Sequence, residues 1–339
     1  MPASPASASN SGGAVLVCVP NWVGDGIMAM PALQAYRKLN PAARIILLVK
    51  PAMRPLWAMH EAADGMVELL PGLRPAVNAV RAAGGERVVI LPHSFRSALI
   101  PCLAGIPERR GMPGHWRRWL LTDVVLPVPD PARTHQGYDY LDLLAPGTPT
   151  GSFEPPRLRV PDSALAAARE RLASLASPRI ALMPGAARGP SKQWPAEHFI
   201  ELGRRLAARP GAGLAVLGSA REAELCARVA AGIGAAARSL AGGTTLAEWA
   251  ALLQTCALVV CNDSGGAHVA AAVGTPAVVI FGMTDPARTA PLGGRCRILQ
   301  SEGPRSRDIA RDDPGAIKKL ASIMPERVYQ AALECLAGR

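Results

Sequence analysis

The sequence predicts an α/β protein of two domains, each a doubly wound parallel β-sheet with helices on both faces. Short aliphatic runs alternate with helical segments along almost the whole chain, as in sheets assembled from successive βα units. Hydrophobic residues make up 49% of the 339 residues and aromatics only 4%. The core is therefore mainly aliphatic, which suits parallel strands buried on both faces. A chain of this length accommodates two domains of ordinary size.

In the first half of the chain, each predicted strand is a short apolar run that ends in a loop containing Gly, Pro or polar residues. The expected strands are 14–20, 44–49, 87–91 and 124–128, and the expected helices are 27–39, 51–61, 74–83 and 94–104. Pro31 is placed near the first turn of its helix, where proline is tolerated.

A Pro/Gly/Ser/Thr-rich stretch at 145–161 predicts a linker between the domains. The natural ligand site then lies in the cleft between them. The predicted organisation is a flexible tail at 1–13, a first domain at 14–160, a second domain at 161–325 and a C-terminal helix at 326–339, which can pack back on the first domain.

The second half repeats the alternation, and its helix at 245–256 opens with a capping box, Thr245-Leu-Ala-Glu248. Residues 301–322 are polar and broken by Pro and Gly, so a long loop is expected there. The other expected helices are 163–176, 195–208, 221–231, 267–273 and 325–336, and the expected strands are 179–183, 214–218, 257–261 and 277–281.

The stretch from 257 to 285 carries the most specific local signal. Its first strand ends in Asn-Asp-Ser-Gly-Gly at 262–266, directly before a short helix. A helix N-terminus at the carboxyl end of a parallel strand offers free N–H groups and a positive dipole to an anion. Asp263 can accept hydrogen bonds from a sugar or simply cap the helix, and His268 can contact a ligand or be structural. An ordinary βαβ turn is the competing interpretation.

The formal net charge of +11 and a pI near 9.8 favour anionic partners: nucleic acid, anionic lipid headgroups or phosphorylated sugars. Seven scattered cysteines without a C-x-x-C pair indicate neither a zinc site nor a disulfide framework, and so a reducing compartment. Residues 1–13 lack the basic and apolar regions of a signal peptide. No apolar run approaches the ~20 residues of a membrane span, so membrane contact would be peripheral.

Asp25 follows the first strand, in Asn-Trp-Val-Gly-Asp-Gly at 21–26. Glycines on both sides let the backbone turn sharply and expose the carboxylate as a general base. The alternative is an N-cap for the next helix, which spacing alone favours.

Lys192 lies between a strand and a helix, behind a loop of small residues at 184–191 that can lie close to a ligand. A lysine there can neutralise a phosphate leaving group, although a solvated loop lysine is the common case. The spacing does not match a P-loop, and no G-x-G-x-x-G follows the first strand. The absence of that glycine pattern argues against a dinucleotide oxidoreductase.

Glu222 follows the strand that ends near Gly218-Ser219. A carboxylate at this place can hydrogen-bond a ribose diol, as in other nucleotide-binding α/β units. An acid that complements the helix dipole is an equally good explanation.

The run from 87 to 118 holds six arginines against one acid, Glu108, and Trp116 and Trp119 lie at its end. This is a candidate surface for a polyanionic acceptor or an anionic membrane, or simply a solvated basic loop. No DNA-recognition element is present, so a nucleic-acid partner is not expected.

Six segments in this order resemble the bacterial lipopolysaccharide heptosyltransferases: NWVGD, LPHSFRSAL, GIPERRG, MPGA…SKQWP, the Gly218-Ser219 strand end and CNDSGGAHVAAAVGTP. The resemblance covers nearly the whole chain. It implies a GT-B fold, with two Rossmann-like domains facing across a cleft. It also implies inverting transfer of a heptose from ADP-heptose onto the first heptose of the lipopolysaccharide inner core, without metal or cofactor, by a cytoplasmic enzyme peripheral to the inner membrane of a Gram-negative bacterium.

Matched to this chain, the resemblance makes Asp25 the general base and Lys192 the phosphate contact. The acceptor would bind the first domain and the ADP-sugar the second. The expected donor-binding residues are Gly185, Ala186, Lys192, Glu222, Asp263, Ser264, Gly265, Gly266 and His268. The expected acceptor-binding residues are Asn21, Trp22, His93, Ser94, Arg96, Arg109 and Arg110.

The chain departs from the family pattern in two places. Gly266 and Ala267 stand where the family more often has a bulky residue, and residues 301–319 do not resemble the usual family loop.

Overall fold

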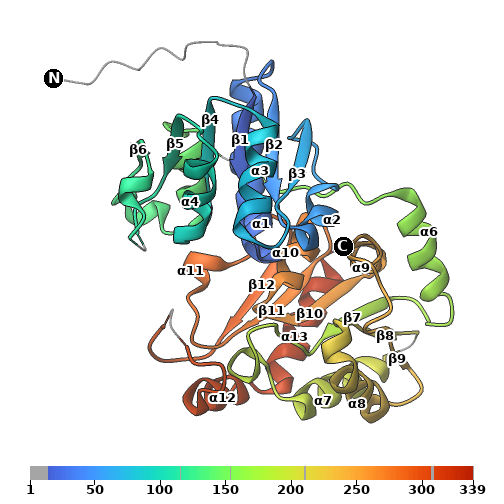
Figure 1. Ribbon diagram of the computed structural model, residues 1–339. Helices are drawn as coiled ribbons and strands as arrows, with labels where there is room; N and C mark the ends of the chain where they lie inside the picture. The colour runs from blue at the N-terminus through green and yellow to red at the C-terminus, as the bar shows by residue number, and fades with distance from the viewer. Residues whose placement is uncertain (1–13, 115, 153, 210, 307–308, 339) are drawn as a thin grey trace.

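The structure, a computed structural model, describes residues 14–338 except 115, 153, 210 and 307–308 (Figure 1). The tail predicted at 1–13 lies outside the described residues. The described residues form two six-stranded sheets in which every strand pair is parallel. Helices interleave with the strands in both sheets, so the predicted fold class is confirmed.

The N-terminal sheet has the order β3-β2-β1-β4-β5-β6. Side chains alternate across its central strand β1, so Val17 packs with α1 and α5 while Leu16 and Cys18 pack with α3 and α4. The strands are β1 Val15–Cys18, β2 Ile45–Val49, β3 Gly65–Glu68, β4 Arg87–Ile90, β5 Glu108–Gly111 and β6 Asp123–Val124. The helices are α1 Val23–Leu39, α2 Arg54–Trp57, α3 Leu73–Ala83, α4 Phe95–Leu103 and α5 Gln136–Leu144, with short 3-10 turns η1 Pro51–Met53, η2 Arg118–Leu120 and η3 Pro131–Arg133.

The C-terminal sheet has the order β12-β11-β10-β7-β8-β9. Its strand β10 is buried at every residue, with Val259 and Cys261 facing the α9–α10 side and Leu258 and Val260 facing α7, α8 and α13. The strands are β7 Arg179–Met183, β8 Gly213–Val216, β9 Ala237–Ser239, β10 Leu258–Asn262, β11 Ala277–Phe281 and β12 Cys296–Gln300. The helices are α6 Asp162–Arg171, α7 Ala196–Ala207, α8 Ala223–Ile233, α9 Leu246–Thr255, α10 Gly265–Ala272, α11 Pro286–Thr289, α12 Pro314–Ala321 and α13 Pro325–Ala337, with turns η4 Pro190–Lys192 and η5 Ala220–Glu222.

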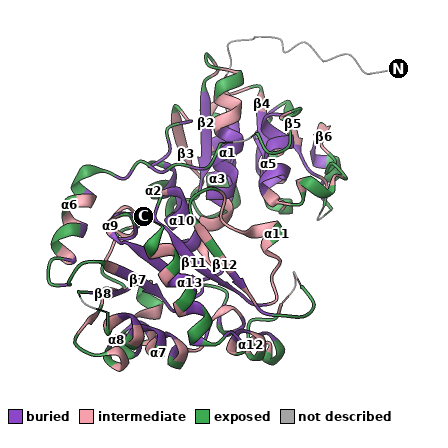
Figure 2. Cartoon of the chain, turned by 180° about the vertical axis from the view of Figure 1, so that it is seen from behind, coloured by how far each residue is buried: buried purple, intermediate pink, exposed green. Residues whose placement is uncertain are grey.

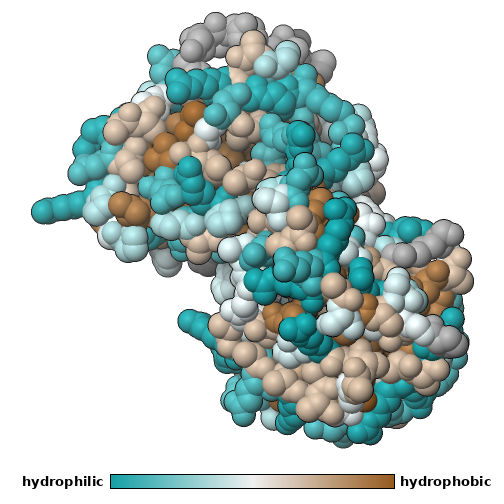
Figure 3. Space-filling model, turned by 90° about the vertical axis from the view of Figure 1, so that its right-hand side faces the viewer, coloured by the Kyte–Doolittle hydropathy of each residue, from teal (hydrophilic) through white to brown (hydrophobic). Residues whose placement is uncertain are grey.

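The two domains meet where α1 packs against α10, and the buried core is continuous across this junction (Figure 2). Ile27 and Met30 of α1 belong to the same cluster as Val269 and Ala270 of α10. Beside the junction the surface is notched between the two domains (Figure 3). The interdomain boundary therefore combines a packed contact between α1 and α10 with an open notch beside it.

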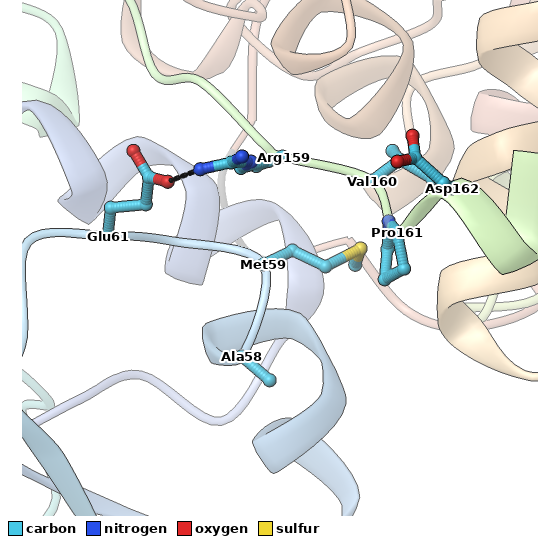
Figure 4. A pocket seen from close by; sticks show the side chains of 7 residues that line it. All are labelled: Ala58, Met59, Glu61, Arg159, Val160, Pro161 and Asp162. Carbon is cyan, nitrogen blue, oxygen red and sulfur yellow. Dashed lines mark hydrogen bonds and ion pairs between the residues drawn. The ribbon is translucent and has the colours of Figure 1, made fainter.

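The described residues of the predicted linker run as irregular chain and are bonded to both domains. Leu158 N–H donates to Ala272 O at 3.1 Å, and Arg159 N–H donates to Met59 O at 2.8 Å. Arg159 also pairs with Glu61 across a hollow of about 340 Å³ that the linker and the α2–β3 segment enclose (Figure 4). The linker is thus held on the surface rather than free.

Several boundaries differ from the sequence prediction. Strands β3, β5, β9 and β12 and helix α5 were not predicted, and the predicted helix at 51–61 is only a 3-10 turn followed by the short α2. Part of the expected loop at 301–322 is helix α12. Pro31 lies well inside α1, not near its first turn, because α1 begins as early as Val23.

The C-terminal helix α13 packs on the second domain, against α7, β10, β11 and β12. Its buried side chains Val328, Ala331 and Ala332 join the cluster on that face of the C-terminal sheet. This corrects the expectation that it can return to the first domain: its apolar stripe covers a sheet face that would otherwise be open.

Candidate functional site

Two helix N-termini, one from each domain, meet at the interdomain junction. Helix α1 follows β1 and helix α10 follows β10, so both begin at the carboxyl edge of a central strand. A Cβ added to Gly265 would lie 3.1 Å from Val23 Cβ, and one on Gly24 would lie 3.0 Å from His268 Cδ2. Small residues therefore permit this close approach. The positive ends of two helix dipoles are brought to one place, which favours an anion.

Asp25 lies in the first turn of α1. The N-cap position belongs to Trp22, whose side chain makes no capping bond, so the interpretation of Asp25 as the N-cap is wrong. Gln136 Nε2 lies 3.4 Å from Asp25 Oδ1 and donates to Tyr140 Oη at 2.6 Å. Burial, with Asp25 next in effect, raises the pKa of Tyr140, so its hydroxyl stays protonated. Gln136 escaped sequence analysis because α5 itself was not predicted.

Lys192 and Asp263 form an ion pair beside the start of α10. Lys192 Nζ donates to Asp263 Oδ2 at 2.5 Å, and the two side chains are only 16% and 9% exposed. Thr284 Oγ1 donates to the same carboxylate oxygen at 2.7 Å. An ammonium has three N–H donors, so Lys192 can keep its bond to Asp263 and still donate to a ligand anion. The structure thus brings together two residues predicted to bind the donor.

Asn262 holds the small-residue loop against the C-terminal sheet. It is fully buried, and its Nδ2 donates to Pro184 O at 2.9 Å and Gly185 O at 3.2 Å. Its Oδ1 accepts from Trp194 N–H at 2.9 Å. A buried amide with all these bonds is a positioning group. Sequence analysis missed it, although a polar residue ending an apolar strand was the available signal.

Glu222 takes the capping role that was weighed against ribose binding. Its Oε2 accepts from Ser219 N–H at 2.8 Å and Ser219 Oγ at 2.7 Å, which completes a capping box at η5. Its other oxygen lies against Gly185, where an added Cβ would be only 2.0 Å away. The structure therefore accounts for Glu222 without a ligand, and ribose binding stays a prediction.

The close contact between Gly185 and Glu222 yields a stability prediction. Gly185→Ala is expected to lower the free energy of unfolding by about 1–3 kcal/mol, because the new methyl group overpacks a carboxylate held by its cap. Glu222→Ala alone loses the cap, at about 1 kcal/mol. In the double variant the clash is absent, so urea denaturation should give clearly less than the sum of the two losses. A loss of unfolding free energy in the double variant equal to the sum of the two single losses would contradict the contact between Gly185 and Glu222.

His268 lies at the centre of the junction, 4% exposed, and its Nδ1 has no hydrogen-bond partner among the described residues. Burial lowers the pKa of His268 to about 4, against a smaller opposing effect of Asp263; His135 and Lys192 add to the lowering. The ring is therefore neutral near pH 7. A neutral imidazole can accept or donate one hydrogen bond to a ligand without adding charge.

The lowered pKa of His268 predicts an acid-sensitive fold. Between pH about 4 and 6.5 the His268 imidazole binds a proton in the unfolded chain but not in the folded chain. Above pH about 6.5, His268 therefore does not lower the free energy of unfolding. As the pH falls from about 6.5 to about 4, the free energy of unfolding decreases by up to about 3 kcal/mol because of this residue. In His268→Gln, urea denaturation should show a flatter decline on acidification. His60 and His135 are kept in both proteins, so equal slopes would exclude His268.

A second interdomain contact joins α11 to the start of α5. Arg288 donates to Asp139 at 2.7 Å and to Thr134 O at 2.9 Å. His135 Nδ1 accepts from Gly137 N–H at 3.0 Å, which places its proton on Nε2, and that atom lies 2.8 Å from Ala290 O. The next residue, Gln136, contacts Asp25. Gln136, which contacts the candidate base, therefore lies next to contacts between the domains, none of which sequence analysis identified.

Three of the predicted acceptor residues, Asn21, Ser94 and Arg96, line a hollow of about 340 Å³ at the carboxyl edge of the N-terminal sheet. Lys50, which sequence analysis did not single out, lines it as well. Ser94 also caps α4 by accepting from Ser97 N–H. The other two nearby candidates, Trp22 and His93, are exposed and half-buried respectively. The acceptor role of all five predicted residues stays a prediction.

The remaining two predicted acceptor residues, Arg109 and Arg110, are engaged within their own domain. Arg109 donates to the carbonyl oxygens of residues 106, 107 and 120. Arg110 donates to Leu143 O at 2.8 Å and pairs with Asp123. These bonds fix β5 and β6, so the structure gives both arginines a structural role and does not bring them to the hollow.

The other predicted donor residues lie around the start of α10 and the facing loop. Ser264 is the N-cap residue of α10, and Ala186 is buried in the loop that Asn262 holds. A Cβ on Gly266 would lie 2.0 Å from Met183 Cε and 3.2 Å from Trp249, so a bulky residue here requires Met183 to move. That contact is the physical counterpart of the departure from the family pattern at this position.

Two Rossmann-like domains that meet through helix N-termini, with a carboxylate on one side and a lysine on the other, form the GT-B arrangement. Comparison with known proteins agrees: the profile of glycosyltransferase family 9 (heptosyltransferase) matches residues 76–316. The chain belongs to this family of glycosyltransferases. The resemblance inferred from six sequence segments is confirmed.

The relatives align over almost their full length. The chain is 30% identical to lipopolysaccharide heptosyltransferase 2 of Escherichia coli K12, covering 93% of this chain and 96% of the relative. It is 29% identical to lipooligosaccharide heptosyltransferase 2 of Haemophilus ducreyi, covering 95% and 99%. The solved structure of E. coli ADP-heptose lps heptosyltransferase II superposes with a TM-score of 0.82 at 30% identity, covering 96% and 99%. E. coli heptosyltransferase WaaC with ADP shares the fold, with a TM-score of 0.74 at 20% identity, covering 95% and 99%.

Within the part of the chain that the structure describes, no helix is both long and apolar enough to cross a membrane.

Proposed function

We propose that this glycosyltransferase moves a heptose from ADP-L-glycero-D-manno-heptose onto the first heptose of the lipopolysaccharide inner core. The names of the relatives support both the sugar and the second position in the series. The observation that carries the proposal lies around His268. That ring touches Gly24, next to Asp25, and interacts electrostatically with Asp263 and Lys192. The proposed base of one domain and the proposed phosphate-binding group of the other are thus both close to this ring.

In the proposed reaction Asp25 takes the proton from an acceptor hydroxyl as its oxygen attacks the anomeric carbon. The bond from that carbon to ADP breaks on the opposite face, and ADP leaves with the electron pair. Negative charge then grows on the diphosphate. Lys192 and the backbone N–H groups at the start of α10 can stabilise that charge more in the transition state than in the ground state. The configuration at the anomeric carbon is therefore inverted.

The proposed reaction uses no metal ion and no cofactor. Its support is that Lys192 and the two helix dipoles supply positive charge where the diphosphate would lie. Heptose transfer should therefore persist in EDTA. Loss of activity that Mg²⁺ or another divalent ion restores would contradict this part of the proposal.

The enzyme is further proposed to act in the cytoplasm, peripherally on the inner membrane of a Gram-negative bacterium, and to have no nucleic-acid partner. The net charge of +11 supports attraction to an anionic surface. Its acceptor would be anchored in that surface by lipid A. Peripheral binding should fall with rising salt, because screening weakens exposed charge interactions.

The test uses purified protein, ADP-heptose and inner-core acceptors that carry no heptose, one heptose or two. Mass analysis should show one added heptose on the acceptor that already has one. Addition to the heptose-free acceptor or only to the longer one would assign another position in the same family. Thermal stabilisation by ADP-heptose with no transfer to any acceptor would instead favour a nucleotide-sugar-binding protein.

A further inference from the structure

A cluster of exposed aromatic and basic side chains lies at the edge of the N-terminal domain, outside the junction described above. Trp116 is 91% exposed, Trp119 72% and Phe95 37%. Phe95 and Trp119 contact each other, with ring centroids 6.0 Å apart. Arg96 and Arg118 are exposed beside them in the chain. We define these five residues as the aromatic-basic patch.

A buried arginine holds this patch in place. Arg117 is fully buried, and its guanidinium donates to Met112 O at 2.8 and 2.9 Å and to Ser97 Oγ at 3.1 Å. It also donates to Pro92 O and to Ser94 O. These bonds tie the segment after β5 to the start of α4. The backbone at Arg117 is therefore fixed relative to the start of α4, where Phe95 and Arg96 lie.

Trp116, an exposed residue, also has an unusual backbone conformation. Its φ is +58°, the one positive value among described residues other than glycine. Such a conformation is disfavoured for a bulky residue, at a cost on the order of 1 kcal/mol or more. The hydrogen bonds of the adjacent Arg117 can offset that cost, and the Trp116 indole is left displayed to solvent.

The excess of arginine around the patch indicates that the surface it binds is anionic. Residues 69–122 contain eight arginines and only two acids, Glu86 and Glu108. Glu86 precedes β4 and Glu108 begins β5, where it pairs with Arg87, so both lie at the amino edge of the sheet. The patch follows the carboxyl ends of β4 and β5, which lie on the β6 side of this domain (Figure 1). Indole rings with arginines are the side chains that suit an anionic membrane interface.

The patch continues into the hollow that holds the predicted acceptor residues. Arg96 lines that hollow and donates to Gly72 O at 2.6 Å, which joins the patch to the segment after β3. Leu70, 52% exposed, and Lys50 line the hollow on that side. A bilayer on the patch would therefore lie beside the same strand edge from which Asp25 projects.

We propose that the aromatic-basic patch docks on the headgroup region of an anionic phospholipid bilayer and so presents the membrane-anchored acceptor to the cleft. This rests on the proposed function for the identity of the acceptor, but lipid binding itself does not depend on it. Burying two indoles and pairing two arginines with lipid phosphates are the interactions that would hold the domain there.

The probe is full-length protein with vesicles of phosphatidylglycerol and phosphatidylcholine, compared with phosphatidylcholine alone. Sedimentation should show binding to the anionic vesicles that weakens in high salt. Trp116→Ser/Trp119→Ser should weaken it more than about tenfold, and Arg118→Gln about fivefold. Met324→Ser, which removes a residue 57% exposed on the other domain, is the matched control and should bind normally.

A second readout separates this proposal from the function. Turnover on a water-soluble acceptor lacking lipid A should be the same in the wild type and the double tryptophan variant. Equal vesicle binding by the two proteins, or equal binding to neutral and anionic vesicles, would overturn the proposal that the patch docks on an anionic bilayer. The proposed heptose transfer would not be affected by that result. If vesicle binding depends on the tryptophans but neither the wild type nor the variants transfer heptose, the docking role of the patch is supported and the proposed function is overturned.

Discussion

Asp25→Asn is expected to lower kcat for heptose transfer by on the order of 10²–10⁴, the usual contribution of a general base. The amide has nearly the shape of the carboxylate and can still accept from Gln136, so the first turn of α1 should be unchanged. It cannot take up the acceptor proton. Binding of ADP-heptose should be largely retained, because the proposed donor contacts come from the other domain.

The measurements are single-turnover transfer rates and donor affinity by calorimetry. Asp130→Asn is the matched control: Asp130 is a carboxylate of the same domain that caps η3, and asparagine keeps that cap. Full turnover in Asp25→Asn would refute the assignment of the base. If the variant loses both donor binding and turnover, Asp25 would instead be assigned to substrate binding rather than to proton transfer.

Lys192→Gln should reduce kcat/KM by about 10²–10³, the typical effect of removing one group that stabilises transition-state charge. Donor affinity should weaken as well, since the ground-state diphosphate already carries charge. Glutamine is chosen because its amide can still donate to Asp263. Glutamine removes the cation, but a residue with no donor would also leave that nearly buried carboxylate without this hydrogen bond, which adds a destabilisation unrelated to the ligand.

Lys318→Gln, an exposed lysine on α12 of the same domain, controls for the loss of one positive charge. Thermal unfolding of each variant shows whether any fall in activity follows a loss of structure. Unchanged affinity for ADP-heptose, with an intact fold, would remove the phosphate contact from Lys192. A fall in affinity alone, with kcat unchanged, would mean that Lys192 binds the donor equally in the ground and transition states.

Sequence by itself determined the class of fold, because its strongest signals are local. The buried strands β1, β2, β7, β10 and β11 are apolar runs, and strands covered on both faces have that pattern whatever their neighbours are. The start of α10 was predicted for a similar reason: turn and cap residues directly after a buried strand leave few alternatives.

Strands β3, β5 and β9 were decided by tertiary structure. Their sequences GMVE, ERRG and ARS carry little β propensity, and none is fully buried. They are extended because each pairs with a neighbour already in the sheet, so their stability comes from ladder hydrogen bonds rather than from their own composition. Helix α12 depends likewise on contacts, which are mainly with η4, distant in sequence.

The candidate site divides along the same line. Asp25, Lys192, Asp263 and His268 could be named from sequence because polar residues after buried strands face the carboxyl edge of a parallel sheet. Their partners could not be named. Gln136 reaches Asp25 across 111 residues, and Lys192 reaches Asp263 across 71. A side chain's hydrogen-bond partner is set by which surfaces pack together, and only the folded chain settles that.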